Sequence, residues 1–148
     1  MTSQTVHASA VLVGARAVLI RGPSGAGKSR LTLELIEAAR AGRFARLVGD
    51  DRVHLQAAGG RLLVRPAAAL AGLIEVRGAG LRRLDYEPCA VVGLVVDLNA
   101  ADAERLPGRT RTEVEGIDLP RLAVAPGAAA LPGVLALLTS GAAAAADI

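Results

Sequence analysis

The residues with the clearest chemistry form one glycine-rich loop, Gly22-Pro23-Ser24-Gly25-Ala26-Gly27-Lys28-Ser29. This loop fits the pattern G-x-x-x-x-G-K-[ST], in which glycines let backbone N–H groups turn inward around phosphate oxygens. In such a loop Lys28 reaches the β- and γ-phosphates, and the hydroxyl of Ser29 ligates Mg²⁺. An apolar run precedes the loop and an amphipathic run follows it, so a helix N-terminus would face the anion. The sequence therefore predicts a site for the phosphates of a nucleoside triphosphate.

Lysine usage supports this prediction. Lys28 is the only lysine among 17 lysine and arginine residues. A compact ammonium thus stands where phosphates are expected, and arginine fills the other basic positions. The guanine-reading motif Asn-Lys-x-Asp needs another lysine, so the sequence disfavours a GTPase.

Carboxylates that could serve phosphoryl transfer follow the loop. Asp50 and Asp51 come about twenty residues later, after the short apolar run Leu47-Val48 and at the strand end where α/β sheets build sites. Neighbouring side chains on an extended backbone point different ways, so one could reach Mg²⁺ while the other faces a nucleophile. The alternative is that both are solvated turn residues. Asp97, which ends the most apolar run, resembles a Walker B aspartate and competes for the metal role.

Other candidates are less specific by themselves. Glu75 follows an apolar run and is a possible second metal ligand. His7 stands at the start of the run before the loop strand, whereas we interpret His54 as structural. Arg105, Arg109 and Arg111 lie in a polar segment, residues 102–113, which we expect to be a mobile loop that could cover the γ-phosphate. An ordinary solvated loop is the alternative.

Composition bounds the class of protein. The chain has 148 residues, which suits one domain spanning residues 1–148. The single cysteine, Cys89, excludes an internal disulfide and fits a reducing compartment. We find no secretory signal and no apolar stretch of the ~20 residues that a membrane span needs. We therefore expect a cytoplasmic protein without membrane contact. Scattered arginines and only two aromatic residues argue against nucleic acid as a partner.

The hydrophobic pattern predicts an α/β fold with a mixed sheet and flanking helices. We expect strands or short apolar runs at residues 9–13, 17–20, 47–48, 53–55, 62–64, 73–76, 90–98 and 119–124. We expect helices at residues 28–40 and 132–138, and a hairpin turn at residues 57–60. The alanine-rich end, about residues 140–148, is expected to be disordered.

Taken together, these segments resemble the catalytic domain of HPr kinase/phosphorylase, which acts on a serine of the phosphocarrier HPr. The resemblance covers residues 7–126. It rests on His7, on GPSGAGKS, on LVGDDRV at residues 47–53 and on GLIEVRGAGL at residues 72–81. It implies a P-loop-containing mixed sheet similar to the phosphoenolpyruvate carboxykinase-like nucleotide-binding fold. The chain begins shortly before His7, as in the short form found in some proteobacteria.

The resemblance also implies which residues bind the nucleotide and metal. The amides of residues 22–29 and Lys28 would hold ATP. Ser29 and Glu75 would ligate Mg²⁺, with Asp50 close by. The segment Glu75-Val76-Arg77-Gly78 is implied to be catalytic, with Arg77 shaping it for both directions of the reaction.

The acid–base roles come from the same resemblance. Asp51 would be the base toward the serine hydroxyl, and the proton donor in the reverse phosphorolysis. His7 would lie beside Asp51 and help to set its protonation, and Arg109 looks like the family's catalytic loop arginine. The family's arginine-bearing dephosphorylation segment reads here as residues 123–128, without arginine; Arg121 is the nearest. Kinase activity is therefore implied more directly than phosphorylase activity.

We thus expect an ATP- and Mg²⁺-dependent protein-serine kinase with an HPr-like phosphocarrier as substrate, in a chain that could form homo-oligomers. Two alternatives stay open. One is a P-loop small-molecule kinase whose arginine-bearing segment acts as a lid. The other is a non-catalytic nucleotide-binding sensor, against which the candidate base Asp51 argues.

Overall fold

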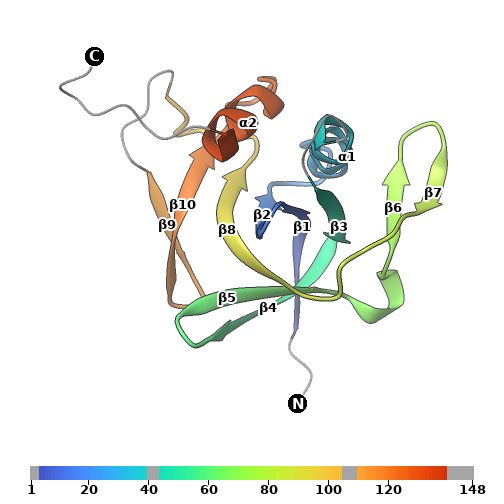
Figure 1. Ribbon diagram of the computed structural model, residues 1–148. Coiled ribbons are helices and arrows are strands. Elements are labelled where there is room, and N and C mark those ends of the chain that lie inside the picture. The colour runs from blue at the N-terminus through green and yellow to red at the C-terminus, as the bar shows by residue number, and fades with distance from the viewer. Residues whose placement is uncertain (1–3, 40–43, 105–109, 140–148) are drawn as a thin grey trace.

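The computed structural model describes residues 4–39, 44–104 and 110–139, which form a strongly curved mixed sheet with two helices on one face (Figure 1). In chain order the elements are β1 (Thr5–Val13), β2 (Arg16–Arg21), α1 (Lys28–Ala38), β3 (Ala45–Gly49), β4 (Arg52–Ala58), β5 (Arg61–Pro66), a 3-10 turn η2 (Ala68–Leu70), β6 (Leu73–Val76), β7 (Gly80–Arg83), β8 (Ala90–Asp97), β9 (Arg111–Val114), β10 (Ile117–Ala123) and α2 (Leu131–Thr139). Figure 1 shows α1 and α2 above β2 and β8, with the β4–β5 hairpin on the opposite side.

Strands β1 and β8 each belong to both halves of the sheet. The first residues of β1 pair antiparallel with β4, and the rest of the strand lies between β2 and β3. Strand β8 begins antiparallel to β5 and continues parallel to β2 and β10. The strands β2, β1, β4, β5 and β8 therefore close into a ring, with β3 and β10 attached outside it.

Two apolar clusters hold these layers together, because successive side chains of a strand face opposite sides of the sheet. The first cluster joins the ring strands and includes Ala8, Ala10 and Leu19. The second packs the sheet against α1 and α2 and includes Ile20 and Leu31. Each fully buried leucine or isoleucine contributes about 1.5–3 kcal/mol relative to exposure. The helix that follows the glycine loop is thereby fixed on the sheet.

One edge of the sheet gathers the chemically interesting segments. Strand β1 runs antiparallel to β2 and β3, with Ala8 opposite Arg21 and Ala10 opposite Gly49. The beginning of β1 therefore lies beside the carboxyl ends of β2 and β3. Residues 22–29, the turn after β3 and His7 consequently share this edge.

The expected mixed sheet, helices and main strands are confirmed, but two strands were not expected. Strand β7 forms an outlying hairpin with β6, which projects beside α1 in Figure 1. Strand β9 pairs with β10, so the prediction of a loop throughout residues 102–113 is wrong for residues 111–113. Strand β7 is exposed throughout, and β9 has one buried apolar residue, Val114, so neither four-residue strand carries an apolar pattern long enough to predict it. No helix in the described ranges is long and apolar enough to cross a membrane.

Candidate active site

The glycine loop (residues 22–29) connects β2 to α1 in a conformation that needs glycine. Gly27 stands at the helix N-cap with a φ of 103°, and Gly22 has a φ of 155°. A Cβ atom on Gly22 would come within 3.1 Å of the Leu98 Cβ and within 3.3 Å of the Leu98 carbonyl oxygen. Side chains at these positions would be strained or would clash, so the backbone itself forms the surface of the loop.

The beginning of α1 is a favourable place for an anion. Within the described residues no side chain caps this helix end, and its first turn contains no acidic residue. The first N–H groups of a helix have no partner within the helix, and the helix dipole adds partial positive charge. Lys28 is buried, at 7% exposure, and its Nζ donates to the carbonyl oxygens of Gly22 (2.8 Å) and Pro23 (3.1 Å). The ammonium thus lies at the start of the loop, and its contact with phosphates stays a prediction.

Asp50 connects the glycine loop to β1. Its carboxylate is 5% exposed and accepts hydrogen bonds from the Ser29 hydroxyl at 2.7 and 2.9 Å. The buried Ser9 hydroxyl donates to the same carboxylate at 2.7 Å. The backbone N–H of Glu75 lies 3.4 Å from the second carboxylate oxygen. Asp50 therefore joins three chain segments at the edge of the sheet.

Ser9 is a site residue that sequence reasoning missed, because we assigned it to an apolar run. Its hydroxyl donates to Asp50 and accepts the backbone N–H of Asp51 at 3.1 Å. A small polar residue within an otherwise apolar strand, V-H-A-S-A-V, was the available signal. Ser9 holds both aspartates against β1.

Replacing Ser9 by alanine should lower the free energy of unfolding by about 1.5–3 kcal/mol, because a hydrogen bond to a buried charge is lost. Urea unfolding at neutral pH measures this value. Thr32→Val is a matched control, since the Thr32 hydroxyl is equally buried but donates only to the Lys28 carbonyl. The control should cost less than about 1 kcal/mol. Equal losses in the two variants would contradict the assigned role of Ser9.

Asp51 occupies a strained turn between β3 and β4. The N–H of Arg52 donates to the Asp50 carbonyl at 2.7 Å, and Asp51 has a φ of 68°. A three-residue turn with positive φ is rare and strained, and such strain often marks functional sites. The Asp51 carbonyl accepts the N–H of Ala8 at 3.2 Å, and the Asp51 N–H donates to the Ser9 hydroxyl. Strand β1 therefore holds both backbone groups of Asp51. The exposed Asp51 carboxylate is thereby presented at the edge.

His7 lies beside Asp51, as the resemblance implied. The distance from His7 Nδ1 to Asp51 Oδ1 is 3.5 Å, and both side chains are more than half exposed. The other ring nitrogen, Nε2, lies 2.8 Å from the guanidinium of Arg52. A carboxylate, an imidazole and a guanidinium therefore form one exposed row next to the buried Asp50.

The segment Glu75-Val76-Arg77-Gly78 reaches this site through its backbone. Only the Glu75 N–H contacts Asp50, and the side chains of Glu75 and Arg77 are exposed. Gly78 lies in the β6–β7 turn, where its φ is 86°. The structure thus brings the start of the segment to Asp50, whereas Arg77 points to solvent on the outlying hairpin.

The donor set can be compared with the needs of Mg²⁺. No group of three or more His, Cys, Asp or Glu side chains in the described part of the chain is arranged to hold a metal. Mg²⁺ commonly binds through one or two carboxylates, substrate phosphates and water instead. The hydroxyl oxygen of Ser29 and the carboxylate oxygens of Asp50 are hydrogen-bonded to each other beside the loop. They fit the part of a Mg²⁺ coordination sphere that the protein would supply.

Asp97 does not fit the metal role for which it competed. Its carboxylate accepts hydrogen bonds from Arg21 at 2.7 and 2.8 Å and from Arg121 at 2.6 Å. Arg121 also binds Asp102 at 2.8 and 3.1 Å. Two guanidinium groups thus use the oxygens that a metal would need, so the interpretation as a Walker B-like ligand is wrong. This ion-pair cluster fastens the carboxyl ends of β2, β8 and β10.

The cluster should make stability depend on pH. Burial raises the pKa of Asp97, but the hydrogen bonds and charges of Arg21 and Arg121 outweigh it and hold this pKa below 3.8. The folded state therefore binds fewer protons, and the stabilisation is complete above the ordinary pKa and lost as pH falls through the folded value. Asp97→Asn should cost about 1.5–3 kcal/mol at pH 7. Its difference from the wild type should shrink below about pH 4 in urea titrations.

Asp118→Asn is the control for this prediction. Asp118 pairs with Arg111 at 2.7 Å on the exposed β9–β10 hairpin. An exposed pair contributes about 0–1 kcal/mol, so this variant should be nearly as stable as the wild type. A pH-independent loss in Asp97→Asn would contradict the ion-pair explanation.

Of the three arginines in the expected lid, Arg111 lies in the described part of the chain. Arg105 and Arg109 lie outside the described residues. Arg111 belongs to β9 and is paired with Asp118, so it does not extend over the glycine loop. The catalytic role implied for Arg109 stays a prediction.

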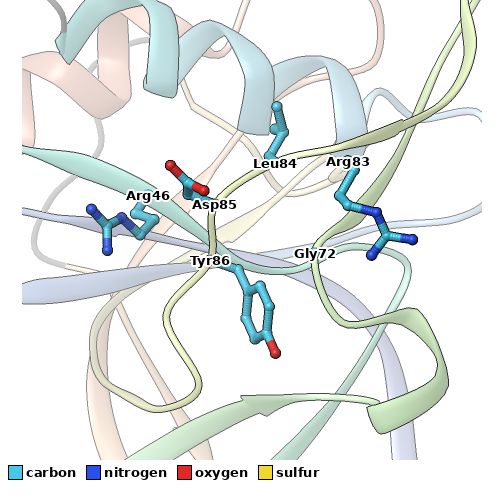
Figure 2. Close-up of a pocket in the computed structure, with 6 residues that line it drawn as sticks. All are labelled: Arg46, Gly72, Arg83, Leu84, Asp85 and Tyr86. Carbon is cyan, nitrogen blue, oxygen red and sulfur yellow. The ribbon is translucent and has the colours of Figure 1, made fainter.

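A cavity of about 520 Å³ lies away from this edge, beside the start of β3 (Figure 2). Its lining residues are Arg46, Gly72, Arg83, Leu84, Asp85 and Tyr86. Figure 2 shows the Arg46 and Arg83 side chains on opposite sides, with Tyr86 between them. Arg46 is already paired with Glu87 at 3.0 Å and lies over the Phe44 ring. None of the predicted site residues within the described ranges lines this cavity.

Comparisons with known proteins identify the family to which this sequence is similar. Residues 1–86, which include the glycine loop, both aspartates and Glu75, match the family model of the HPr Serine kinase C-terminal domain. The HPr kinase/phosphorylase of Geobacillus thermodenitrificans is 35% identical over 132 residues, covering 80% of this chain and 41% of that protein. The HPr kinase/phosphorylase of Streptococcus thermophilus is 44% identical over 78 residues, covering 52% of this chain and 24% of that protein. The matches thus span about a quarter to two fifths of these relatives.

A solved structure has the same fold. The Hpr(Ser) kinase/phosphatase from Coxiella burnetii superposes with a TM-score of 0.71. The match covers 92% of this chain and 91% of that chain, at 24% sequence identity. At this identity the likeness establishes the mixed α/β architecture.

Proposed function

The chain belongs to the HPr Serine kinase C-terminal domain family, and from this premise we propose that it transfers the γ-phosphate of ATP to a serine of an HPr-like phosphocarrier protein. One observation carries the proposal. The buried Asp50 binds Ser29 of the glycine loop and begins the turn that presents Asp51. A phosphate-binding loop and a candidate base are therefore held at a fixed separation.

The finer features of the fold belong to the same proposal. We interpret residues 22–29 as a P-loop, and the sheet around it as a phosphoenolpyruvate carboxykinase-like nucleotide-binding fold. The strand, glycine loop and uncapped helix follow in the order that P-loops use. We place this activity in the cytoplasm, where ATP and phosphocarrier proteins meet.

Holding the triphosphate is the task of the loop. Its inward backbone N–H groups and the first turn of α1 would donate to the β- and γ-phosphate oxygens. Lys28 would exchange its bonds to the Gly22 and Pro23 carbonyls for phosphate oxygens, which are stronger acceptors because they are charged. This movement is short, since the ammonium already lies at the loop.

Asp51 is the group proposed to accept the proton of the attacking serine. The serine oxygen forms a bond to the γ-phosphorus while the bond to the β,γ-bridging oxygen breaks, and ADP leaves with that electron pair. The serine proton passes to a carboxylate oxygen of Asp51. His7 keeps the nearer oxygen, Oδ1, in place through its Nδ1.

Ser29 and Asp50 are proposed to hold Mg²⁺, with Glu75 as a further ligand. When bound there, the ion would neutralise phosphate charge and orient the γ-phosphoryl group. Asp50 is suited to this role because Ser9 fixes the carboxylate that faces Ser29. The exposed Glu75 side chain extends from the β-strand whose backbone already contacts Asp50.

The kinase direction is the one proposed. The nearest arginine to residues 123–128 is Arg121, and its guanidinium is engaged by Asp97 and Asp102. An arginine with two carboxylate partners is not free to bind an incoming phosphate. We therefore do not extend the proposal to phosphorolysis. Homo-oligomer formation stays a prediction from the resemblance.

Two other functions use the same site. A small-molecule kinase would need a lid over the loop, and of the three candidate arginines the described Arg111 is tied to Asp118. A non-catalytic sensor would need the loop and Asp50 but not the strained turn at Asp51. That turn favours a catalytic function.

Incubating the purified protein with γ-labelled ATP, Mg²⁺ and HPr from the same organism tests the proposal. We expect label on HPr only when all three components are present. Label found only on small molecules would favour the lid-kinase alternative. ATP binding without transfer to any acceptor would favour the sensor.

A further inference from the structure

Arg52 lies directly beside the ring of His7. Residues His7 and Arg52 are direct partners across the antiparallel pair β1–β4, so their side chains lie on the same face. One guanidinium nitrogen of Arg52 is 2.8 Å from His7 Nε2, and the other is 3.4 Å from the Thr5 hydroxyl. On the far side of the ring, Nδ1 faces Asp51 Oδ1 at 3.5 Å. The imidazole is thus held between a cation and an anion.

The chemistry of the two neighbours determines where the ring proton is. A guanidinium has donors and no acceptor, so in the contact with Arg52 the nitrogen Nε2 must accept. A neutral imidazole has one acceptor nitrogen and one N–H, so the proton is then on Nδ1. That N–H faces the Asp51 carboxylate, and an ionised carboxylate can accept hydrogen bonds but cannot donate them. Both contacts require the same tautomer.

We propose that Arg52 is a positioning residue, which fixes His7 as the Nδ1–H tautomer and directs that N–H toward Asp51 Oδ1. An unrestrained histidine prefers the Nε2–H tautomer, so the arrangement needs a partner that occupies Nε2. The side chains of His7 and Asp51 are exposed, so water competes for their polar atoms. Because Arg52 is a charged donor, its hydrogen bond to Nε2 is stronger than one from water.

The consequence for catalysis rests on the proposed function. When the Nδ1–H of His7 is directed at Oδ1, the other oxygen of Asp51, Oδ2, keeps its lone pairs free to accept a serine proton. If Nε2 carried the proton instead, the Nδ1 lone pair would face the carboxylate and repel it. Loss of Arg52 should therefore misplace the base without weakening the hold on ATP.

Nitrogen NMR of histidine-labelled protein tests the tautomer without any assay of activity. The chain has only His7 and His54, so His54→Gln assigns the spectrum. The spectra are recorded at about pH 8.5, about two units above the ordinary pKa of a histidine side chain. We expect the wild-type His7 to show a protonated Nδ1, and Arg52→Ala to show predominantly a protonated Nε2. A wild-type ring with the proton on Nε2, or the same tautomer in both proteins, would overturn the proposal. Arg52→Lys, which keeps a charged donor, gives a second comparison if Arg52→Ala does not fold, and a wild-type ring with the proton on Nε2 would overturn the proposal without any variant.

Kinetics separate positioning from a structural role. Arg52→Ala should lower kcat roughly tenfold, less than the ~10² expected for loss of a base, with the KM for ATP unchanged. Arg52→Lys should recover part of kcat, because an ammonium also donates to Nε2. Arg65→Ala is the matched control, since Arg65 is an exposed arginine on β5 that donates at 2.8 Å to the neutral Gln56. An unchanged kcat in Arg52→Ala, or an equal loss in the control, would contradict positioning.

The two proposals fail in different ways. A wild-type protein that transfers no phosphate to HPr would refute the proposed function. The nitrogen spectrum would still report whether Arg52 sets the tautomer of His7.

Discussion

Replacing Lys28 by alanine is expected to reduce phosphoryl transfer by at least ~10³-fold, the range in which loss of a transition-state cation usually falls. Among the described residues, Lys28 is the cation that the glycine loop holds at its own carbonyl groups, with Nζ 2.8 Å from the Gly22 oxygen and 3.1 Å from the Pro23 oxygen. Without it, the loop would have no side-chain cation to stabilise the developing charge on the phosphates, and only its backbone dipoles and the proposed Mg²⁺ would oppose that charge. Rates of label transfer from γ-labelled ATP measure the effect.

Two further variants make the Lys28 prediction specific. Lys28→Met keeps the buried aliphatic stem without the charge, so it should be as inactive as alanine while staying folded. Arg30→Ala removes an exposed cation two residues further along α1 and should transfer phosphate at close to the wild-type rate. Substantial activity in Lys28→Met would refute the phosphate-binding assignment of the loop.

Asp51→Asn should lower turnover by at least ~10² while leaving Mg-ATP affinity within about twofold. Asparagine tolerates positive φ nearly as well as aspartate, so the turn with a φ of 68° should survive the exchange. The variant thus removes the charge of the carboxylate and little else. Calorimetric ATP titrations, combined with single-turnover transfer rates, separate binding from chemistry.

The opposite pattern would reassign Asp51. If the variant lost ATP affinity but transferred phosphate normally once saturated, Asp51 would be a metal ligand. Asp118→Asn, on the exposed β9–β10 hairpin, is the control and should change neither quantity. Asp50→Asn should differ from Asp51→Asn by weakening Mg²⁺-dependent binding, because Asp50 is the carboxylate that touches Ser29.

The parts of the site that the sequence predicts are those with local signals. The loop and α1 follow from the positions of Gly22, Gly27 and Lys28, because backbone conformation and helix initiation depend on neighbouring residues. The strand ending before Asp50 is likewise visible as a short apolar run. His7 near Asp51 came from the family resemblance and is matched by a distance of 3.5 Å.

The remaining features depend on partners that are distant in sequence. Ser9 and Asp50 are 41 residues apart along the chain. Ser9 becomes part of the site because β1 pairs with both β2 and β3, which brings its hydroxyl to the Asp50 carboxylate. Asp97 looked equivalent to Asp50 in sequence, as a carboxylate after an apolar strand. Arg21 and Arg121, 76 and 24 residues away, decide that it is a structural ion pair instead. Spacing alone does not distinguish these two outcomes.

The polar strands β7 and β9 show another limit. Strand β7, G-L-R-R, is exposed throughout, and Val114 is the one buried residue of β9, R-T-E-V. Each strand is held by hydrogen bonds to its neighbour. So few apolar residues are too weak a pattern from which to predict a strand. The prediction of a loop at residues 102–113 was wrong at residues 111–113 for this reason.

Mapping the phosphate on HPr by mass spectrometry, after reaction with the protein and Mg-ATP, tests the central claim most directly. We expect one added phosphate on a single serine, absent from reactions with Lys28→Met and strongly reduced with Asp51→Asn. Replacing that serine of HPr by alanine should prevent the modification. Phosphate on another type of residue, or ATP consumption with unmodified HPr, would contradict the account.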